Sequence, residues 1–374
     1  MSKKNESKAK SIKKARNLTQ FVICAVVVAA GGLYAKGVYD NMKPVPALSG
    51  AEASGVEIED IEVSSSEPEI DPNQIIFNTI AVPTKNKFYG DLILVNNDHE
   101  YFSSGKEDLV SIMEMNDEKE ISYFTSVDYT YTILRSVYEP MVDMIKDFYD
   151  KYSNDTLIIY GSYRTKEFQE QLYKERQEND ESSEAPLVAK PGFSEHETGY
   201  AFDFSESVDY DYEGTGDFAW INENSYKYGF IVRYTEEKEK ITQIRPEPWH
   251  FRYVGIPHAY YMAKNDLCLE EYIQLLSEKH PYSGEHLEIT TEDGKNYEVY
   301  FFASDDGAET TDVPVPTGYK YDISGNNVDG FIVTVHKDEK VAIEQEKPTE
   351  ATETTTESET TEVSSEEETE NTEE

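Results

Sequence analysis

The sequence predicts an α+β fold in which mixed helices surround a small antiparallel sheet, with a small β subdomain at the C-terminal end. Three patterns lead to this prediction. Short apolar runs typical of strands alternate with segments of helical spacing between residues 75 and 282. Two other segments alternate aromatic and polar residues with the period of a strand. After residue 282 the chain changes to short β-prone runs separated by Gly, Asn and Pro turns.

The first part of the folded region predicts two strands followed by a helix. Apolar runs at residues 75–82 and 91–95 have the length and composition of strands. Residues 129–152 place apolar side chains at helical spacing, as Val137, Met141 and Ile145 illustrate. The succession of strands and helix indicates a mixed α+β domain.

The middle of the region predicts a strand, a turn and a helix. Residues 157–160 form a short apolar run that leads into Gly161. Thr165 is well placed to cap a helix that continues to about residue 177. Arg164 therefore lies at a turn from strand to helix.

Two alternating segments predict strands that hold polar side chains on one face. In residues 200–204, Asp203 faces away from the aromatic residues on either side. In residues 249–254, His250 and Arg252 share one face. A helix over residues 257–279 follows, and residues 283–337 are expected to form the β subdomain.

The N-terminal residues predict a membrane address. Residues 1–17 are rich in lysine, and residues 18–35 carry no charge and are rich in Val and Ala. This pattern predicts a transmembrane signal anchor with a cytoplasmic basic segment, so the rest of a single-pass cell-membrane protein would be extracytoplasmic. A cleaved signal peptide is the alternative, because residues 29–32 are small.

Two further segments lack the composition of a folded domain. Residues 36–74 are rich in Pro, Ser, Ala and acids, which predicts a flexible linker. Residues 338–374 are dominated by Thr, Ser and Glu, which predicts an acidic disordered tail. The folded parts are therefore expected at residues 75–282 and 283–337.

The charge and the cysteine content argue against a nucleic-acid partner and against an intramolecular disulfide. With 34 basic and 75 acidic residues, the formal net charge is -41, which argues against a nucleic-acid partner. Only Cys268 lies in the part expected to be exported, so no intramolecular disulfide is expected there. The fold must depend on its apolar core.

Two short segments carry a spacing that suits a catalytic zinc site. The first runs from Ser194 to Asp203 as Ser-Glu-His-Glu-Thr-Gly-Tyr-Ala-Phe-Asp, and the second is Glu247-Pro-Trp-His. A catalytic zinc usually takes three protein ligands and keeps one position for water. His196, Asp203 and His250 can supply the ligands, and Glu247 can act as the base.

These residues resemble the VanY-type D-alanyl-D-alanine carboxypeptidases, which are zinc metallopeptidases related to the hedgehog fold. Both halves of the family pattern, Ser-x-His-x-x-Gly-x-Ala-x-Asp and Glu-x-x-His, are intact, and the resemblance extends over about residues 75–280. It implies a D,D-carboxypeptidase that removes the terminal D-Ala from peptidoglycan stem peptides. Metal-bound water would attack the scissile carbonyl, with Glu247 as general base.

The resemblance also suggests residues that contact the substrate. Arg164 stands where the family has an arginine that binds substrate or stabilises the oxyanion; a surface salt bridge is the alternative for it. Ser194 is expected to position the substrate or its loop. Gln171, on the helix after Arg164, is expected to add polar contacts.

Two other functions remain open at this stage. The same ligands occur in L,D-carboxypeptidases, which act on tetrapeptide stems. The related hedgehog-type domains suggest a non-catalytic, zinc-bearing module that binds the cell wall. The presence of Glu247 and Arg164 favours catalysis over the second alternative.

Overall fold

The computed structural model describes residues 75–179, 188–206 and 211–342. The expected basic segment, signal anchor and linker lie outside these residues, as does the tail beyond residue 342. Within the described ranges, no helix has both the length and the apolar composition needed to cross a membrane. The membrane address therefore remains a prediction.

The elements follow one another in a mixed order. The α-helices are α2 (Ile112–Glu118), α3 (Arg135–Tyr152), α4 (Lys166–Asn179), α5 (Ala219–Asn224), α6 (Glu239–Thr242), α7 (Ile256–Asn265) and α8 (Leu269–Lys279). The strands are β1 (Phe77–Pro83), β2 (Leu109–Ser111), β3 (Thr125–Ser126), β4 (Thr132–Leu134), β5 (Leu157–Gly161), β6 (Ala201–Glu206), β7 (Phe230–Tyr234), β8 (Glu247–Tyr253), β9 (Leu287–Thr290), β10 (Asn296–Ala303), β11 (Thr310–Pro316), β12 (Tyr319–Gly325) and β13 (Gly330–Lys340).

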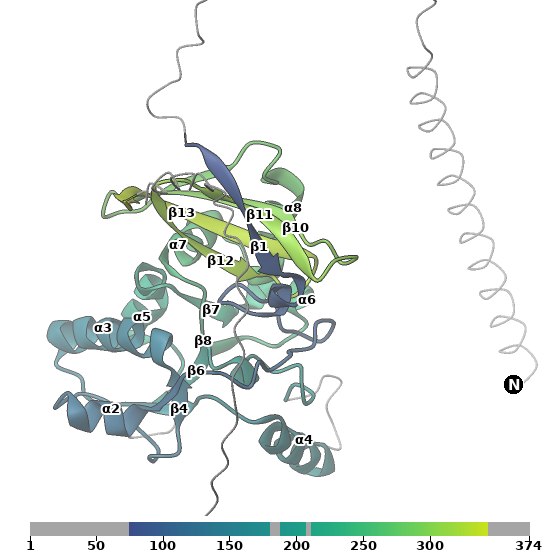
Figure 1. Cartoon of the computed structure of the whole chain (residues 1–374). Coiled ribbons are helices and arrows are strands. Elements are labelled where there is room, and N and C mark those ends of the chain that lie inside the picture. Colours follow the sequence, from purple (N-terminus) through teal and green to yellow (C-terminus); the bar gives the residue numbers. More distant parts are fainter. Residues whose placement is uncertain (1–74, 180–187, 207–210, 343–374) are drawn as a thin grey trace, which may run out of the picture. The chain divides into compact units, whose positions relative to one another are not determined.

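The central sheet confirms the expected α+β fold. Its order is β3-β5-β6-β8-β7, and all neighbouring pairs are antiparallel except β3 with β5. Phe202, Phe204 and Phe251 share a buried cluster with the apolar side of α3 and with Ile221 of α5. Figure 1 shows α3 and α5 together at the side of this sheet. Because these helices cover the aromatic face, the other face is left for polar side chains.

The C-terminal β subdomain is also present. Its sheet has the order β12-β13-β10-β9; α8 packs against β10, beside which it lies in Figure 1, and α7 contacts β9. Along β10, Val299 and Phe301 pack with these helices, whereas Tyr300 packs with the two-stranded sheet of β1 and β11. Alternate side chains thus enter two different cores. Burial on both faces explains the nearly continuous apolar runs in β10 and β13.

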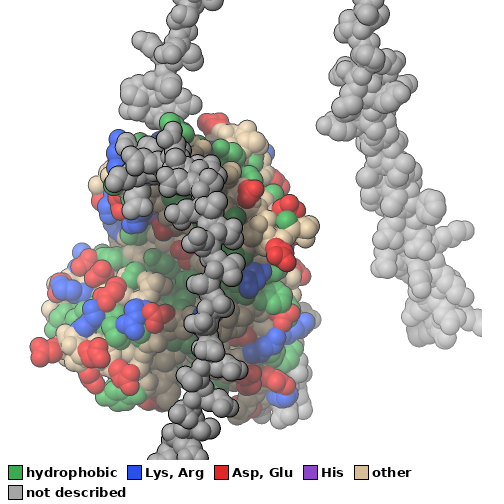
Figure 2. Space-filling model, in the orientation of Figure 1, with side chains coloured by type: hydrophobic (Ala, Val, Ile, Leu, Met, Phe, Trp, Pro, Cys, Tyr) green, Lys and Arg blue, Asp and Glu red, His purple; other side chains and the backbone are tan. Residues whose placement is uncertain are grey.

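Acidic and basic side chains lie interspersed on the face shown in Figure 2. Surface ion pairs of the described residues include Lys119 with Glu139 and Lys337 with Glu288. Pairs of this kind add little stability because water screens them. The stability of the fold therefore depends on its buried clusters.

Two expected domain boundaries need correction. Strand β1 pairs with β11 over residues 77–83 and 310–316, so the start of the expected 75–282 domain packs with the C-terminal subdomain. Strand β13 continues to Lys340, so residues 338–340 of the expected tail belong to the sheet. Strand pairing between distant segments is not visible in local composition, which is why both boundaries were misplaced.

Three expected elements also differ from the structure. Residues 91–95 form no strand, because their backbone groups bind elsewhere: the N–H of Leu94 donates to the carbonyl of Asn326. The expected helix over 257–279 is two helices. The left-handed backbone of Asp266, with φ of 51°, ends α7, and Cys268 is the N-cap of α8. The helix expected over 129–152 begins only at Arg135, after β4.

His258 links α7 to the subdomain and predicts a pH-dependent stability. Its ring nitrogens contact the hydroxyls of Tyr272 and Thr334 at 2.8 and 3.0 Å, and burial lowers its pKa from 6.5 to about 3. Below pH 6.5 the histidine side chain binds a proton in the unfolded chain, whereas in the folded protein it stays neutral down to about pH 3. This histidine should therefore reduce the free energy of unfolding by up to about 1.4 kcal/mol per pH unit between about pH 6 and pH 4.

Denaturant unfolding at pH 7, 6 and 5 measures this effect. His258→Gln removes the titrating group, so the variant should lose stability less steeply over this range. Equal slopes for the two proteins would contradict the role given to His258.

Candidate active site

The three expected ligands meet on the polar face of the central sheet. Strands β5, β6 and β8 place Gly161, Asp203 and His250 directly opposite one another. The Oδ1 atom of Asp203 lies 2.9 Å from Nδ1 of His250, and its Oδ2 atom lies 3.2 Å from Nε2 of His196. One ligand atom from each of these residues can be chosen so that all lie within 4.8 Å of one another. The register of the sheet therefore assembles the site.

His196 reaches the site from η2 (Glu195–Thr198), a 3₁₀ helix just before β6. Its Nδ1 donates to the carbonyl oxygen of Ser162 at 2.9 Å, and its own carbonyl accepts from the N–H of Arg164 at 3.0 Å. The segment after β5 thus holds His196 through both side chain and backbone. With Nδ1 protonated, the neutral ring presents Nε2 toward Asp203.

The site is buried, and its charges are strongly coupled. Burial lowers the pKa of His196 to about 4. For His250, hydrogen bonds to Asp203 and Glu195 outweigh burial and raise the pKa to about 9. Burial alone would raise the pKa of Asp203, but the two imidazoles hold it well below its usual range. Asp203 is therefore an ionised carboxylate between the two imidazoles.

Glu247 lies at the start of β8, within reach of the ligands. Its Oε2 atom is 3.8 Å from Nδ1 of His250. Burial raises its pKa to about 7, and the nearby charge of Asp203 acts in the same direction. A carboxyl group with such a pKa can both accept and release a proton near neutrality. This position suits the role expected for Glu247.

Arg164 also points into the site, and a glutamine that the sequence did not single out lies beside it. Its Nη2 lies 3.5 Å from Oδ2 of Asp203, and its Nη1 lies 3.5 Å from Oε1 of Gln169. Gln169 is fully buried, whereas Gln171 is exposed and donates to Glu175. Residues two apart on a helix do not share a face, so Gln171 lies on the outer side of α4, and its contact with substrate stays a prediction.

Ser194, Trp249 and Arg252 lie on the segments that carry the candidate ligands. Ser194 is buried directly before η2, where its carbonyl accepts the N–H of Glu197. Its contact with substrate stays a prediction. Trp249, next to His250 on β8, remains 37% exposed. Arg252, on the same face of β8 as His250, pairs with Glu195.

Glu195 is the main residue that the sequence did not reveal. Its Oε1 atom accepts from Arg233 and Arg252, each at 2.8 Å, and its Oε2 atom lies 3.4 Å from Nε2 of His250. Arg233 also forms two hydrogen bonds with Glu270 of α8. Glutamates are common in this chain, and only the buried arginine on β8 could have suggested an acidic partner.

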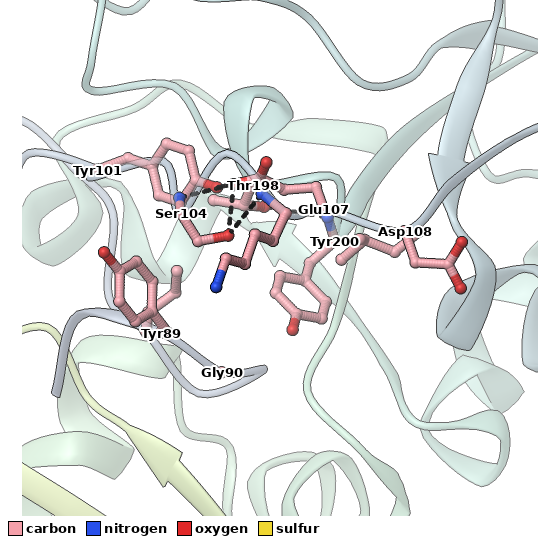
Figure 3. A pocket seen from close by; sticks show the side chains of 11 residues that line it. Tyr89, Gly90, Tyr101, Ser104, Glu107, Asp108, Thr198 and Tyr200 are labelled. Atoms are coloured by element: carbon pink, nitrogen blue, oxygen red, sulfur yellow. Dashed lines mark hydrogen bonds between the residues drawn. The ribbon is translucent and has the colours of Figure 1, made fainter. Parts of the chain in front are cut away.

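A pocket of about 180 Å³ lies against the turn that follows His196. Thr198 and Tyr200 form one wall, and the chain from Tyr89 to Asp108 forms most of the rest. Figure 3 shows the hydroxyls of Tyr101 and Ser104 directed toward Glu107, to which both donate. The pocket contains none of the candidate ligands, so it is separate from the metal set.

The donor set fits a zinc ion. Two imidazoles and one carboxylate form a common set for catalytic zinc, which leaves a position for water. Neutral imidazole and ionised carboxylate are the forms that bind metal, and Asp203 is held ionised. His196, Asp203 and His250 would hold the ion, and Glu247 lies beside them without belonging to the set.

Comparisons with known proteins agree with this arrangement. The sequence model of the VanY family, D-alanyl-D-alanine carboxypeptidase, matches residues 133–256, which include the three ligands and Glu247. A D-alanyl-D-alanine carboxypeptidase of Enterococcus faecium is 34% identical over 256 residues, which are 68% of this chain and 78% of that protein. A second one, from Enterococcus faecalis (strain ATCC 700802 / V583), is 37% identical over 141 residues, which are 34% of this chain and 52% of that protein.

A solved structure resembles the described fold as well. It is the crystal structure of the vancomycin resistance D,D-dipeptidase VanXYg in complex with a D-Ala-D-Ala phosphinate analogue. The similarity has a TM-score of 0.60 and 27% sequence identity, and it covers 70% of this chain and 99% of the other. The likeness therefore extends well beyond the motif.

The close approach of β5 to Asp203 yields a prediction. A Cβ atom at Gly161 would lie only 2.1 Å from Oδ2 of Asp203. We expect Gly161→Ala to displace the carboxylate and weaken zinc binding at least tenfold, because a misplaced ligand loses its coordination geometry. Competition with a chromophoric chelator measures the affinity.

The matched control is Tyr160→Ala, which changes an exposed side chain on the same strand. It should leave the zinc affinity unchanged. Wild-type affinity in Gly161→Ala would show that Asp203 is not constrained by β5.

Proposed function

The chain belongs to the family of VanY-type D-alanyl-D-alanine carboxypeptidases, and from this premise we propose that it is a zinc-dependent D,D-carboxypeptidase acting on peptidoglycan stem peptides. The observation that carries the proposal is the position of Glu247, which lies beside a complete donor set without belonging to it. A metal site that only stabilises a fold has no need of a half-buried, proton-exchanging carboxyl group next to its ligands.

Each residue of the site has a role in peptide hydrolysis. A zinc ion bound by His196, Asp203 and His250 would acidify water and polarise the scissile carbonyl. The Glu247 carboxylate accepts a proton as water adds to the carbonyl carbon. It then gives that proton to the amine of the departing D-alanine when the C–N bond breaks.

Arg164 supplies positive charge at the same place. Its guanidinium can donate to the oxyanion that develops on the carbonyl, or to the terminal carboxylate of the peptide. Gln169 supports it from α4 and also donates to the carbonyl of Ala189 at 2.8 Å. Gln169 thus connects the arginine to the chain that leads to Ser194.

Product analysis tests the proposal. The purified full-length chain receives stem peptides ending in D-Ala-D-Ala, stem peptides ending in one D-Ala, or free D-Ala-D-Ala, each with and without chelator. We expect chelator-sensitive loss of one alanine from the first substrate, seen by mass spectrometry. Preference for the second would establish an L,D-carboxypeptidase, and preference for the dipeptide would establish a dipeptidase. A zinc-loaded protein that cleaves none of them would be a binding module.

Two substitutions separate the base from the ligands. Glu247→Gln should retain zinc and lose turnover by about 10²–10⁴-fold, because only proton transfer is removed. His196→Ala should lose both zinc and turnover. Atomic spectroscopy measures the zinc content of each variant, and initial rates on the stem peptide ending in D-Ala-D-Ala measure its turnover. Unchanged turnover in Glu247→Gln would contradict the mechanism.

The two glutamines of α4 offer a matched pair. Gln169→Ala should lower turnover by about tenfold or more, because Arg164 loses a support and small displacements in an active site are costly. Gln171→Ala, on the exposed side, should behave as wild type. Equal rates in the two variants would remove Gln169 from the site.

A further inference from the structure

We propose that Glu195 is a positioning residue of the metal site, which fixes Nδ1 of His250 as the nitrogen presented to the metal. This inference rests on the proposed zinc site. Glu195 supplies no ligand to the set formed by His196, Asp203 and His250. It acts from behind the His250 ring, on the side opposite to Asp203.

The hydrogen bonds around His250 support this role. Oε2 of Glu195 lies 3.4 Å from Nε2, whereas Oδ1 of Asp203 lies 2.9 Å from Nδ1. A neutral imidazole, the form that binds a metal, carries one N–H. An ionised carboxylate can only accept, and both Asp203 and Glu195 face a nitrogen of this ring. Asp203 belongs to the same donor set, so the hydrogen on Nδ1 is the one that a metal replaces, whereas Glu195 retains the hydrogen on Nε2. The Ser162 carbonyl does the same for His196, where the free nitrogen is Nε2.

Glu195 is itself held in place by two buried arginines. Arg233 and Arg252 both donate to Oε1, which leaves Oε2 for His250. Arg252 also donates to the backbone carbonyls of Asp91 and Ile93, each at 2.9 Å. Because each arginine is anchored elsewhere, the carboxylate cannot turn away from the ring.

A purely structural ion cluster would not need the contact to His250. Arg233 and Arg252 are balanced by Glu195 and Glu270, so the four charges sum to zero without the histidine. Arg233 and Arg252 are satisfied by Oε1, Glu270 and backbone oxygens. The second oxygen of Glu195 is therefore available to orient the ligand.

The test compares Glu195→Gln with Glu270→Gln in the full-length chain. In Glu195→Gln the amide oxygen is expected to face the arginines, so the NH₂ group faces Nε2 and favours a hydrogen on Nδ1. Zinc affinity should fall about 10–100-fold, as is typical when the partner of a ligating histidine is removed. Glu270→Gln removes a partner of Arg233 without touching His250, so it should lower the melting temperature but leave zinc affinity unchanged.

Two further measurements keep the test decisive. The visible spectrum of the Co²⁺-loaded protein should keep its band positions in Glu195→Gln, because the ligands are the same. A shift of these absorption bands that indicates a different coordination of Co²⁺ would identify Glu195 as a ligand and overturn the proposal. If Glu195→Gln fails to fold, Glu195→Asp keeps the charge for the arginines but shortens the reach to His250, and it should also weaken zinc binding.

Equal zinc affinity in wild type, Glu195→Gln and Glu270→Gln would reduce Glu195 to a structural ion pair and overturn the inference. No substrate is involved, so the result is independent of turnover. A wild-type chain that binds no zinc would refute the proposed function as well, whereas normal zinc binding in all variants would refute only the role of Glu195.

Discussion

The register between β6 and β8 is the constraint on which the site depends. Asp203 lies opposite His250, Phe202 opposite Phe251 and Ala201 opposite Arg252. Side chains alternate between the two faces of a strand, so one register places aromatic rings in the core and polar groups on the other face. A slip of one residue in either strand would bury the ligands among the aromatic residues and expose the rings. Core packing under α3 therefore maintains the geometry of the ligands.

The polar face is buried too, which requires its charges to be paired. Glu195, Arg233 and Arg252 are almost fully inaccessible to water. Removing such charges from water is costly unless hydrogen bonds and opposite charges replace the solvent, and here each guanidinium has several acceptors. A cluster of this kind contributes more to a defined geometry than to net stability. Through Glu195 this cluster contacts the ring of His250 and so joins its defined geometry to a candidate ligand.

The C-terminal subdomain contributes to the same geometry through the chain before β2. Arg252 binds the carbonyls of Asp91 and Ile93, and the N–H groups of Leu92 and Leu94 bind Ser324 and Asn326 of the subdomain. Strand β1, just upstream, pairs with β11. The segment between them is therefore held by the subdomain on one side and by Arg252 on the other. In this way the subdomain supports a residue that lies two positions from a candidate ligand.

The sequence alone determined the fold class, the family and the residues that meet at the site, because alternation along β6 and β8 and the spacing of His196, Asp203, His250 and Glu247 are local patterns. Arg164 was also found locally, at the turn after β5. Only the tertiary structure decided that Gln169 and not Gln171 supports Arg164, that Glu195 lies behind His250, and that β1 pairs with β11. Each of these three features depends on contacts between segments that lie far apart in the chain. The composition of one segment does not determine which distant segment it contacts.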